Sequence, residues 1–99
     1  MKRSGHMPAL SPRAKRLVRA GKTLFGDRHQ SALARLIGVS QPYVARLTST
    51  SSELQLPVTD ELEKTLQRKL RSEQSRLLKL SNKLAVIINE IEQEKSNDA

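Results

Sequence analysis

The segment from Gln30 to Leu47 constrains the fold more than any other part of the chain, because it has the pattern of two short helices joined by a tight turn. Gly38 lies between the two helices, at a point where the chain must reverse direction and where glycine accepts a positive φ without a Cβ clash. The apolar positions recur at helical spacing on either side of it, and they are Leu33, Ala34 and Ile37, then Val44 and Leu47. The pattern predicts two crossing helices that bury these residues against each other.

The start of the second helix is marked by three residues. Ser40 is expected to be its N-cap, with Gln41 and Pro42 in the first turn. Proline is tolerated there because the first N–H groups of a helix have no intrahelical partner. Since Val44 and Leu47 form the inner face, Gln41, Pro42, Ala45 and Arg46 are expected to point outward, with Tyr43 at the boundary.

These residues together resemble the helix-turn-helix of lambda-repressor-like, Cro/XRE-type DNA-binding proteins. The features that carry the resemblance are Gln30 opening the first helix, the small Ala34, the turn Gly38-Val39-Ser40, and the aliphatic Val44 and Leu47. The resemblance is close over residues 30–47 and looser over residues 13–70. It implies a five-helix-type domain whose second motif helix enters the major groove of double-stranded DNA. The connection TSTSSELQLP, residues 48–57, departs from the family because it is longer and more polar than in a compact repressor.

The resemblance also implies which residues contact DNA, with base contacts at the outward positions of the second helix. Gln41 suits the N6/N7 edge of adenine, Arg46 suits guanine or a phosphate, and Pro42 and Ala45 suit a thymine methyl group. Tyr43 is equally suited to packing and to reading bases. The residues expected at the phosphate backbone are Gln30, Ser31, Ser40, Ser49 and Arg19. For Ser49, a mobile loop explains the local composition equally well.

The charge is distributed unevenly along the chain. The formal net charge is +8, and residues 1–50 carry ten Lys or Arg against one acid, whereas residues 51–99 carry eight against nine. The half that holds the motif is therefore strongly positive, which favours a polyanionic partner, nucleic acid first and an anionic membrane surface second. The chain has no cysteine and no apolar run of the ~20 residues that a membrane span needs. We expect a cytoplasmic protein, associated with the nucleoid when bound to DNA, and no membrane partner.

No constellation of residues indicates catalysis, a metal site or a cofactor. One of the two histidines, His6, lies in Ser4-Gly5-His6-Met7, which is reminiscent of an expression-vector remnant. The other, His29, is expected to make a local hydrogen bond at the start of a helix. With no glycine-rich phosphate loop either, an enzyme is not expected.

Residues 11–26 are expected to form the first helix. Ser11 would be its N-cap and Pro12 its first residue, and Phe25-Gly26 would close it. Its inner face is expected to carry Leu17, Val18, Ala20 and Leu24. The five basic residues left on the solvent side are Arg13, Lys15, Arg16, Arg19 and Lys22. Two explanations of these basic residues are equally good: some of them contact phosphates, or they form a solvated basic face without a partner.

A long helix is expected from the N-cap Thr59 to Glu94, because no proline or glycine interrupts it. Its seam positions follow a seven-residue period through Leu70, Leu77, Leu84 and Ile91, interleaved with Leu66, Leu80 and Ile87 and broken by Glu73. Further aliphatics at Leu62, Leu78, Val86 and Ile88 widen the stripe. The residues expected to pair two copies of the chain are Leu77, Leu80, Leu84, Ile87, Ile88 and Ile91. A lone helix folding back on its own domain is the alternative.

These observations predict an all-α chain. It would have a disordered tail at 1–10, a helix-turn-helix domain at 11–70, a dimerisation helix at 71–94 and a second disordered tail at 95–99. The expected function is that of a homodimeric transcription regulator, most simply a repressor, on a short DNA palindrome with half-sites about 34 Å apart. An antitoxin-like protein, whose long helix binds a second protein while the motif regulates its own operon, is the alternative. Binding of nucleic acid by charge alone is a weaker one.

Overall fold

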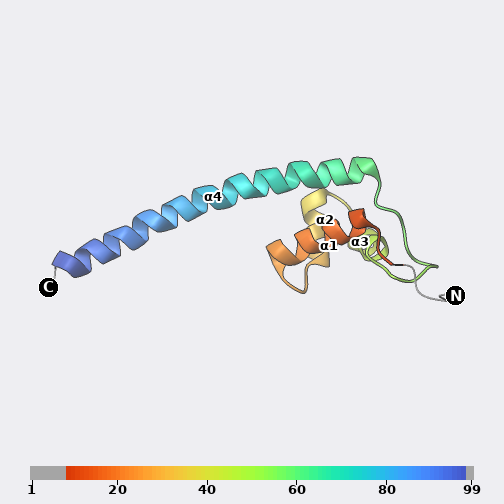
Figure 1. Ribbon diagram of the computed structural model, residues 1–99, viewed down its shortest axis with the longest axis horizontal. Coiled ribbons are helices and arrows are strands. Elements are labelled where there is room, and N and C mark those ends of the chain that lie inside the picture. Colours follow the sequence, from red (N-terminus) through yellow and green to blue (C-terminus); the bar gives the residue numbers. More distant parts are fainter. Residues whose placement is uncertain (1–8, 98–99) are drawn as a thin grey trace. The chain divides into compact units, whose positions relative to one another are not determined.

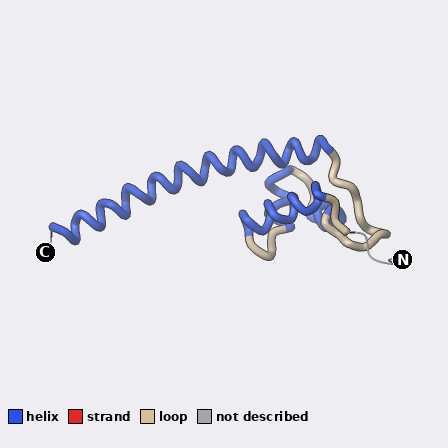
Figure 2. Tube along the Cα trace, viewed as in Figure 1, coloured by secondary structure: helices blue, strands red, loops and turns tan. Residues whose placement is uncertain are grey.

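The chain folds entirely as α-helices and connecting loops over the residues described by the computed structural model, 9–97 (Figures 1 and 2). The helices are α1 (Pro12–Phe25), α2 (Gln30–Ile37), α3 (Gln41–Leu47) and α4 (Asp60–Asn97). The predicted all-α class is therefore confirmed. Residues 1–8, which contain Ser4-Gly5-His6-Met7, and residues 98–99 lie outside the described range, so most of the first predicted tail and the last two residues of the second fall there.

The five-helix domain implied by the family resemblance is not formed by the described residues, which contain four helices. Residues 48–59, between α3 and α4, are non-helical apart from one turn at 52–54. Serine and threonine hydroxyls compete there for the backbone groups that a helix would use. The Thr48 hydroxyl donates to the Val44 carbonyl at 3.0 Å, and the Ser49 hydroxyl accepts from the Ser51 N–H at 3.0 Å. The polar composition of this segment therefore accounts for the missing helix.

Both ends of α1 are formed by the residues that the sequence indicates. The Ser11 hydroxyl accepts a hydrogen bond from the Ala14 N–H at 3.1 Å, and Pro12 occupies the first turn. At the other end Gly26 has a φ of +80° and donates its N–H to the Lys22 carbonyl at 2.9 Å. The predicted limits of α1 are confirmed.

The turn between α2 and α3 is held by bonds at both of its sides. Gly38 adopts the left-handed conformation with a φ of +78°, and the N–H groups of Gly38 and Val39 both donate to the Ala34 carbonyl at 2.9 Å. The Ser40 hydroxyl then caps α3 by accepting from the Tyr43 N–H at 3.2 Å. These bonds end α2 and start α3 within three residues, as the sequence predicts.

The core lies where α1 packs on α2 and α2 packs on α3. Four side chains in it are completely buried, and they are Leu17, Leu33, Val44 and Leu47. The remaining buried apolar residues are Ala14, Ala34, Ile37, Val58 and Leu66. Each of the three short helices therefore contributes at least one fully buried side chain.

The predicted inner face of α1 is only partly right. Leu17 is buried as expected, but Val18, Ala20 and Leu24 are only half-buried, and Ala14 and Gly21 are buried in their place. Gly21 explains the difference. A Cβ atom at this position would lie 2.5 Å from Cδ2 of His29 and 3.1 Å from Cδ2 of Leu33, so only glycine lets α1 approach α2 this closely.

The chain divides into two compact units, Met1–Lys69 and Leu70–Ala99, and α4 contributes residues to both. Its start is capped as predicted, because the Thr59 hydroxyl accepts from the Leu62 N–H at 3.1 Å. Its end differs from the prediction, since residues 95–97, expected in a disordered tail, belong to the helix. No proline or glycine occurs between Asp60 and Asn97, so nothing in the sequence stops the helix earlier.

Candidate nucleic-acid interface

The surface of α3 presents a small set of polar and apolar groups to solvent. Gln41, Pro42 and Arg46 are exposed, whereas Tyr43 and Ala45 are half-buried. On the opposite side of this helix Val44 and Leu47 are fully buried and fix its orientation on α2. Of the expected base-contacting residues, Gln41 and Pro42 are therefore the most accessible at the start of the helix.

Arg46 is tied to the loop that follows α3. Its side-chain Nε donates to the Leu54 carbonyl at 3.0 Å, and its own carbonyl accepts from the Leu56 N–H at 3.0 Å. The two terminal nitrogens of the Arg46 side chain make no hydrogen bond or ion pair within residues 9–97. Arg46 is therefore exposed, but the Nε donor of its guanidinium group is already used. The sequence did not indicate this restraint on the side chain.

Four of the five expected phosphate-contacting residues already have local partners. The Gln30 side chain donates to the Thr48 hydroxyl at 3.3 Å and so links the start of α2 to the end of α3. The Ser31 hydroxyl accepts from Arg35 at 3.4 Å, Ser40 is the cap of α3, and Ser49 accepts from a backbone N–H. A serine hydroxyl that accepts an N–H keeps its own O–H to donate. The three hydroxyls therefore remain able to donate to a phosphate oxygen.

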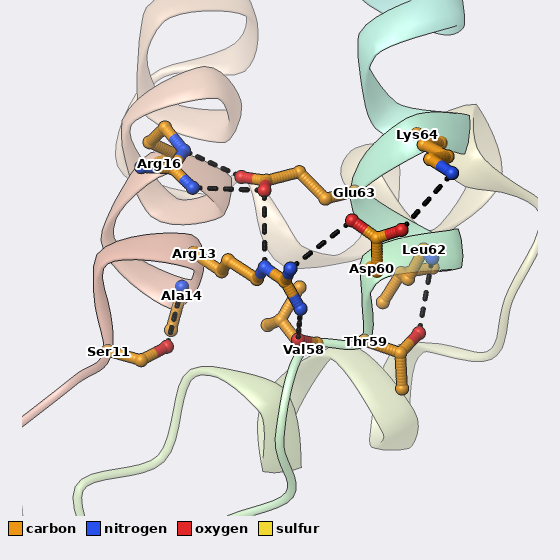
Figure 3. Close-up of polar contacts among 10 residues, drawn as sticks. All are labelled: Ser11, Arg13, Ala14, Arg16, Val58, Thr59, Asp60, Leu62, Glu63 and Lys64. Carbon is orange, nitrogen blue, oxygen red and sulfur yellow. Dashed lines mark hydrogen bonds and ion pairs between the residues drawn. The ribbon is translucent and has the colours of Figure 1, made fainter.

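Arg19, the fifth of these residues, is exposed on α1, and its side chain has no hydrogen bond or ion pair with the rest of the described chain. The side chains of Lys15 and Lys22, on the same helix, are exposed and equally without such partners among residues 9–97. Arg13 and Arg16 on α1 behave differently, as Figure 3 shows.

Arg13 and Arg16 form an ion-pair cluster with Asp60 and Glu63 in the first turn of α4 (Figure 3). Arg16 binds Glu63 with two parallel hydrogen bonds, from Nε at 2.6 Å and from Nη2 at 2.9 Å. Arg13 donates to Asp60 at 3.2 Å and to the Val58 carbonyl at 3.4 Å, and its Nε lies 3.4 Å from Glu63. The cluster ties α1 to the first turn of α4.

The cluster changes the acid–base behaviour of its members. The hydrogen bond from Arg16 holds the pKa of Glu63 below its usual value, with smaller contributions from the charges of Arg16 and Arg13. The same bond raises the pKa of Arg16. From the sequence, both arginines were expected on the solvent side of α1 and neither was paired with an acid, so this cluster was missed. Charged residues 47 positions apart give no local signal of pairing.

His29 has the local role that the sequence predicts. It precedes α2 as the N-cap residue, its side chain is buried, and its Nδ1 lies 3.2 Å from the Asp27 carbonyl oxygen. Within residues 9–97, no group of three or more His, Cys, Asp or Glu side chains is arranged to hold a metal ion. In the same range, none of the helices combines the length and the apolar character needed to cross a membrane.

The second unit carries a row of exposed apolar side chains on α4. Those expected to pair two copies are between 42 and 58% exposed, and they are Leu77, Leu80, Leu84, Ile87, Ile88 and Ile91. Leu78 and Val86 are also exposed. Glu73, the charged seam position, is bound on its own helix by Arg76 at 2.7 Å, which lowers its pKa. The one charge within the seam is therefore compensated without a second chain.

No protein-family model matches the sequence, and no curated protein and no solved structure matches it. The resemblance of residues 30–47 to the Cro/XRE-type motif rests on the residues alone.

Proposed function

We propose that this protein is a sequence-specific regulator of transcription that binds double-stranded DNA as a homodimer, most simply a repressor on a short palindrome. The observation that carries the proposal is the pairing of α2 and α3. A short helix with Val44 and Leu47 buried is held by a three-residue turn and presents Gln41 and Pro42 to solvent. Major-groove recognition needs such a helix, fixed on a second one and with an exposed N-terminal end.

The side chains of α3 suggest how bases would be read. Gln41, exposed in the first turn, has an amide that matches the N6 and N7 positions of adenine. Pro42 offers an apolar surface for a thymine methyl group. Since Nε of Arg46 is bonded to Leu54, a contact to a phosphate through its terminal nitrogens suits Arg46 better than bidentate pairing with guanine.

The charge of the helical domain supports a polyanionic partner. Residues 12–47, which cover the three short helices, hold eight Lys or Arg and one acid, Asp27. No acid lies in the first turn of α1, α2 or α3, so none competes with a phosphate for the partial positive charge at these helix ends. Binding to the DNA backbone would therefore meet little like-charge repulsion.

The exposed apolar side chains of α4 support a dimer. Five exposed aliphatic side chains at seam spacing, with Ile88 beside them, are too much apolar surface for a helix that stays single, and a second copy offers the same seam in return. A two-fold dimer would bind half-sites about 34 Å apart, one turn of DNA. Such a regulator would work in the cytoplasm, on the nucleoid.

Selection from a pool of random DNA duplexes tests the proposal. The purified protein would be mixed with the pool at ~0.15 M salt, where charge alone gives weak binding. The retained duplexes would be sequenced and the protomers per duplex counted. An enriched inverted repeat with two protomers is the expected result. Retention without any enriched sequence would refute specific recognition.

The second candidate is an antitoxin-like protein whose α4 binds another protein. The observation that favours it is the width of the apolar surface, because Leu78 and Val86 are exposed outside the narrow two-stranded seam. Hydrogen exchange and binding of a hydrophobic dye to the purified dimer separate the candidates. Strong dye binding by a dimer would favour this second candidate, whereas a dimer that binds no dye would favour the regulator alone.

A further inference from the structure

The five basic side chains of α1 fall into two sets that the structure treats differently. Arg13 and Arg16 bind Asp60 and Glu63, so their charges are compensated within the molecule. The other three are exposed and have no hydrogen bond or ion pair with any part of the described chain. We call these three the basic row, and they are Lys15, Arg19 and Lys22.

The basic row lies on one face of α1. Its members are spaced by four and then three residues, the spacing of neighbours on a helix surface. They stand about 140–160° around the helix from the buried Leu17, so all three point away from the core. Their accessibility therefore follows from the packing of α1 and does not depend on a loop.

The side chains of the basic row form no ion pair with any acid of the described chain, and few acids are close to them in the sequence. The first turn of α1 has no acid, and Asp27, beyond the end of the helix, is the one acid between residues 12 and 47. Like charges three and four residues apart repel one another on a helix. A bound polyanion would remove this repulsion, which distinguishes the basic row from a face of mixed charges.

We infer that the basic row binds the phosphate backbone of duplex DNA without regard to base sequence. Lys15 and Lys22 are about 10 Å apart along the helix axis, a distance that covers about three phosphate spacings on one DNA strand. The basic row is therefore long enough to contact several consecutive phosphates of one strand. The inference rests on the proposed DNA binding and adds a division of roles to it. The basic row supplies affinity, and the exposed end of α3 supplies sequence preference.

The test is the salt dependence of binding to a duplex of one fixed, arbitrary sequence. The dissociation constant of the wild type and of K15Q/R19Q/K22Q would be measured between about 0.05 and 0.2 M salt. Glutamine keeps helix propensity, so the helical circular dichroism should be unchanged. Loss of three phosphate contacts should reduce the slope of log K against log salt by about 2.7 and weaken binding on the order of 100-fold at 0.15 M.

Two control variants separate a local contact from net charge. R71Q/K79Q/K83Q removes the same three charges from exposed positions of α4, and it should leave the slope within about one unit of wild type. K15R/R19K/K22R keeps the charges of the basic row and should bind like the wild type. If both glutamine variants reduce the slope equally, or if neither does, the inference is wrong.

The same measurement distinguishes this inference from the proposed function. Binding to an arbitrary duplex does not require base reading. If the wild type selects no sequence, but K15Q/R19Q/K22Q shows the expected reduction of the salt slope and of the affinity, the inference is supported and specific recognition is refuted. A wild type that enriches an inverted repeat, with a slope unaffected by the basic row, refutes the inference and leaves the proposed function standing. A wild type that binds no duplex at all overturns both.

Discussion

Gly21 is the position at which a single added methyl group should disturb the helical domain most informatively. It is buried on α1 and faces the ring of His29. A Cβ at this position would lie 2.5 Å from Cδ2 and 2.9 Å from Cγ of that ring, and 3.1 Å from Cδ2 of Leu33. The ring cannot swing away without cost, because it is buried and its Nδ1 lies 3.2 Å from the Asp27 carbonyl oxygen.

Two opposing effects set the magnitude of the G21A change. Overfilling a packed site costs about 1–3 kcal/mol, because neighbouring groups must shift. Alanine in place of glycine inside a helix stabilises the folded state by about 0.8–1.0 kcal/mol through its higher helix propensity. The expected net result lies between no change and a loss of about 2 kcal/mol in the free energy of unfolding. Propensity alone would predict a gain.

A double-mutant cycle with His29→Ala makes this reasoning refutable. Without the ring, the close contact that remains is Cδ2 of Leu33 at 3.1 Å, the end of a side chain that has to shift by only a few tenths of an ångström, so G21A should stabilise the H29A protein by up to about 1 kcal/mol. Urea unfolding followed by the fluorescence of Tyr43, the single tyrosine in a chain without tryptophan, reports on the domain that holds α3. If G21A destabilises both backgrounds equally, the contact with His29 is not the cause.

Three further predictions concern the other features described above. Gln41→Ala should lose roughly 1–3 kcal/mol of discrimination at one base pair, measured by competition between operator variants. Leu84→Asp should give monomers in sedimentation and sharply weaker binding to a palindrome, because it buries a charge in the seam. Glu63→Gln should lower the melting temperature at pH 7. Since the Glu63 pKa is lowered in the fold, its contribution is present above the unfolded value near 4.3 and is lost as the pH falls below it. The difference in melting temperature between the Glu63→Gln variant and the wild type should therefore disappear at acid pH.

Each of these variants has a matched control at an exposed position of α4. Gln74→Ala removes the same amide and should leave base preference unchanged. Asn82→Asp adds a charge away from the seam and should leave the oligomer intact. Glu61→Gln removes a neighbouring carboxylate that is outside the ion-pair cluster. Unchanged sequence preference in the Gln41 variant would contradict its role in base reading, and an intact oligomer in the Leu84 variant would contradict the seam. A difference in melting temperature that does not change with pH would contradict the role given to the Glu63 carboxylate.

The local structure of this chain could be predicted from the sequence because its signals are themselves local. Ser11, Ser40 and Thr59 each cap a helix through a bond to an N–H three residues later, and Gly26 and Gly38 each end one with a positive φ. A cap or a left-handed glycine needs only its immediate neighbours. The residues that form such a bond are only three or four positions apart in the sequence.

The features that were missed depend on contacts between distant residues. Gly21 belongs to the core because His29 and Leu33 lie against it, which no helical period reveals. Arg16 pairs with Glu63 across 47 residues, although each residue alone looks like an ordinary solvated charge. For the candidate interface, the outward positions on α3 could be predicted from the sequence, but the hydrogen bond from Arg46 to the Leu54 carbonyl could not.

The bond from Arg46 to the Leu54 carbonyl has a consequence for how this surface can change. The same residue also accepts the Leu56 N–H, so it helps to determine the path of the segment between α3 and α4. Lysine would keep the positive charge but would lack the planar Nε donor and reach the carbonyl only through a flexible ammonium group. A substitution at this position therefore acts on surface chemistry and on loop conformation together. Substitutions that change the surface of α3 without altering the loop between α3 and α4 are expected at positions such as Gln41, whose side chain has no hydrogen bond within the described residues.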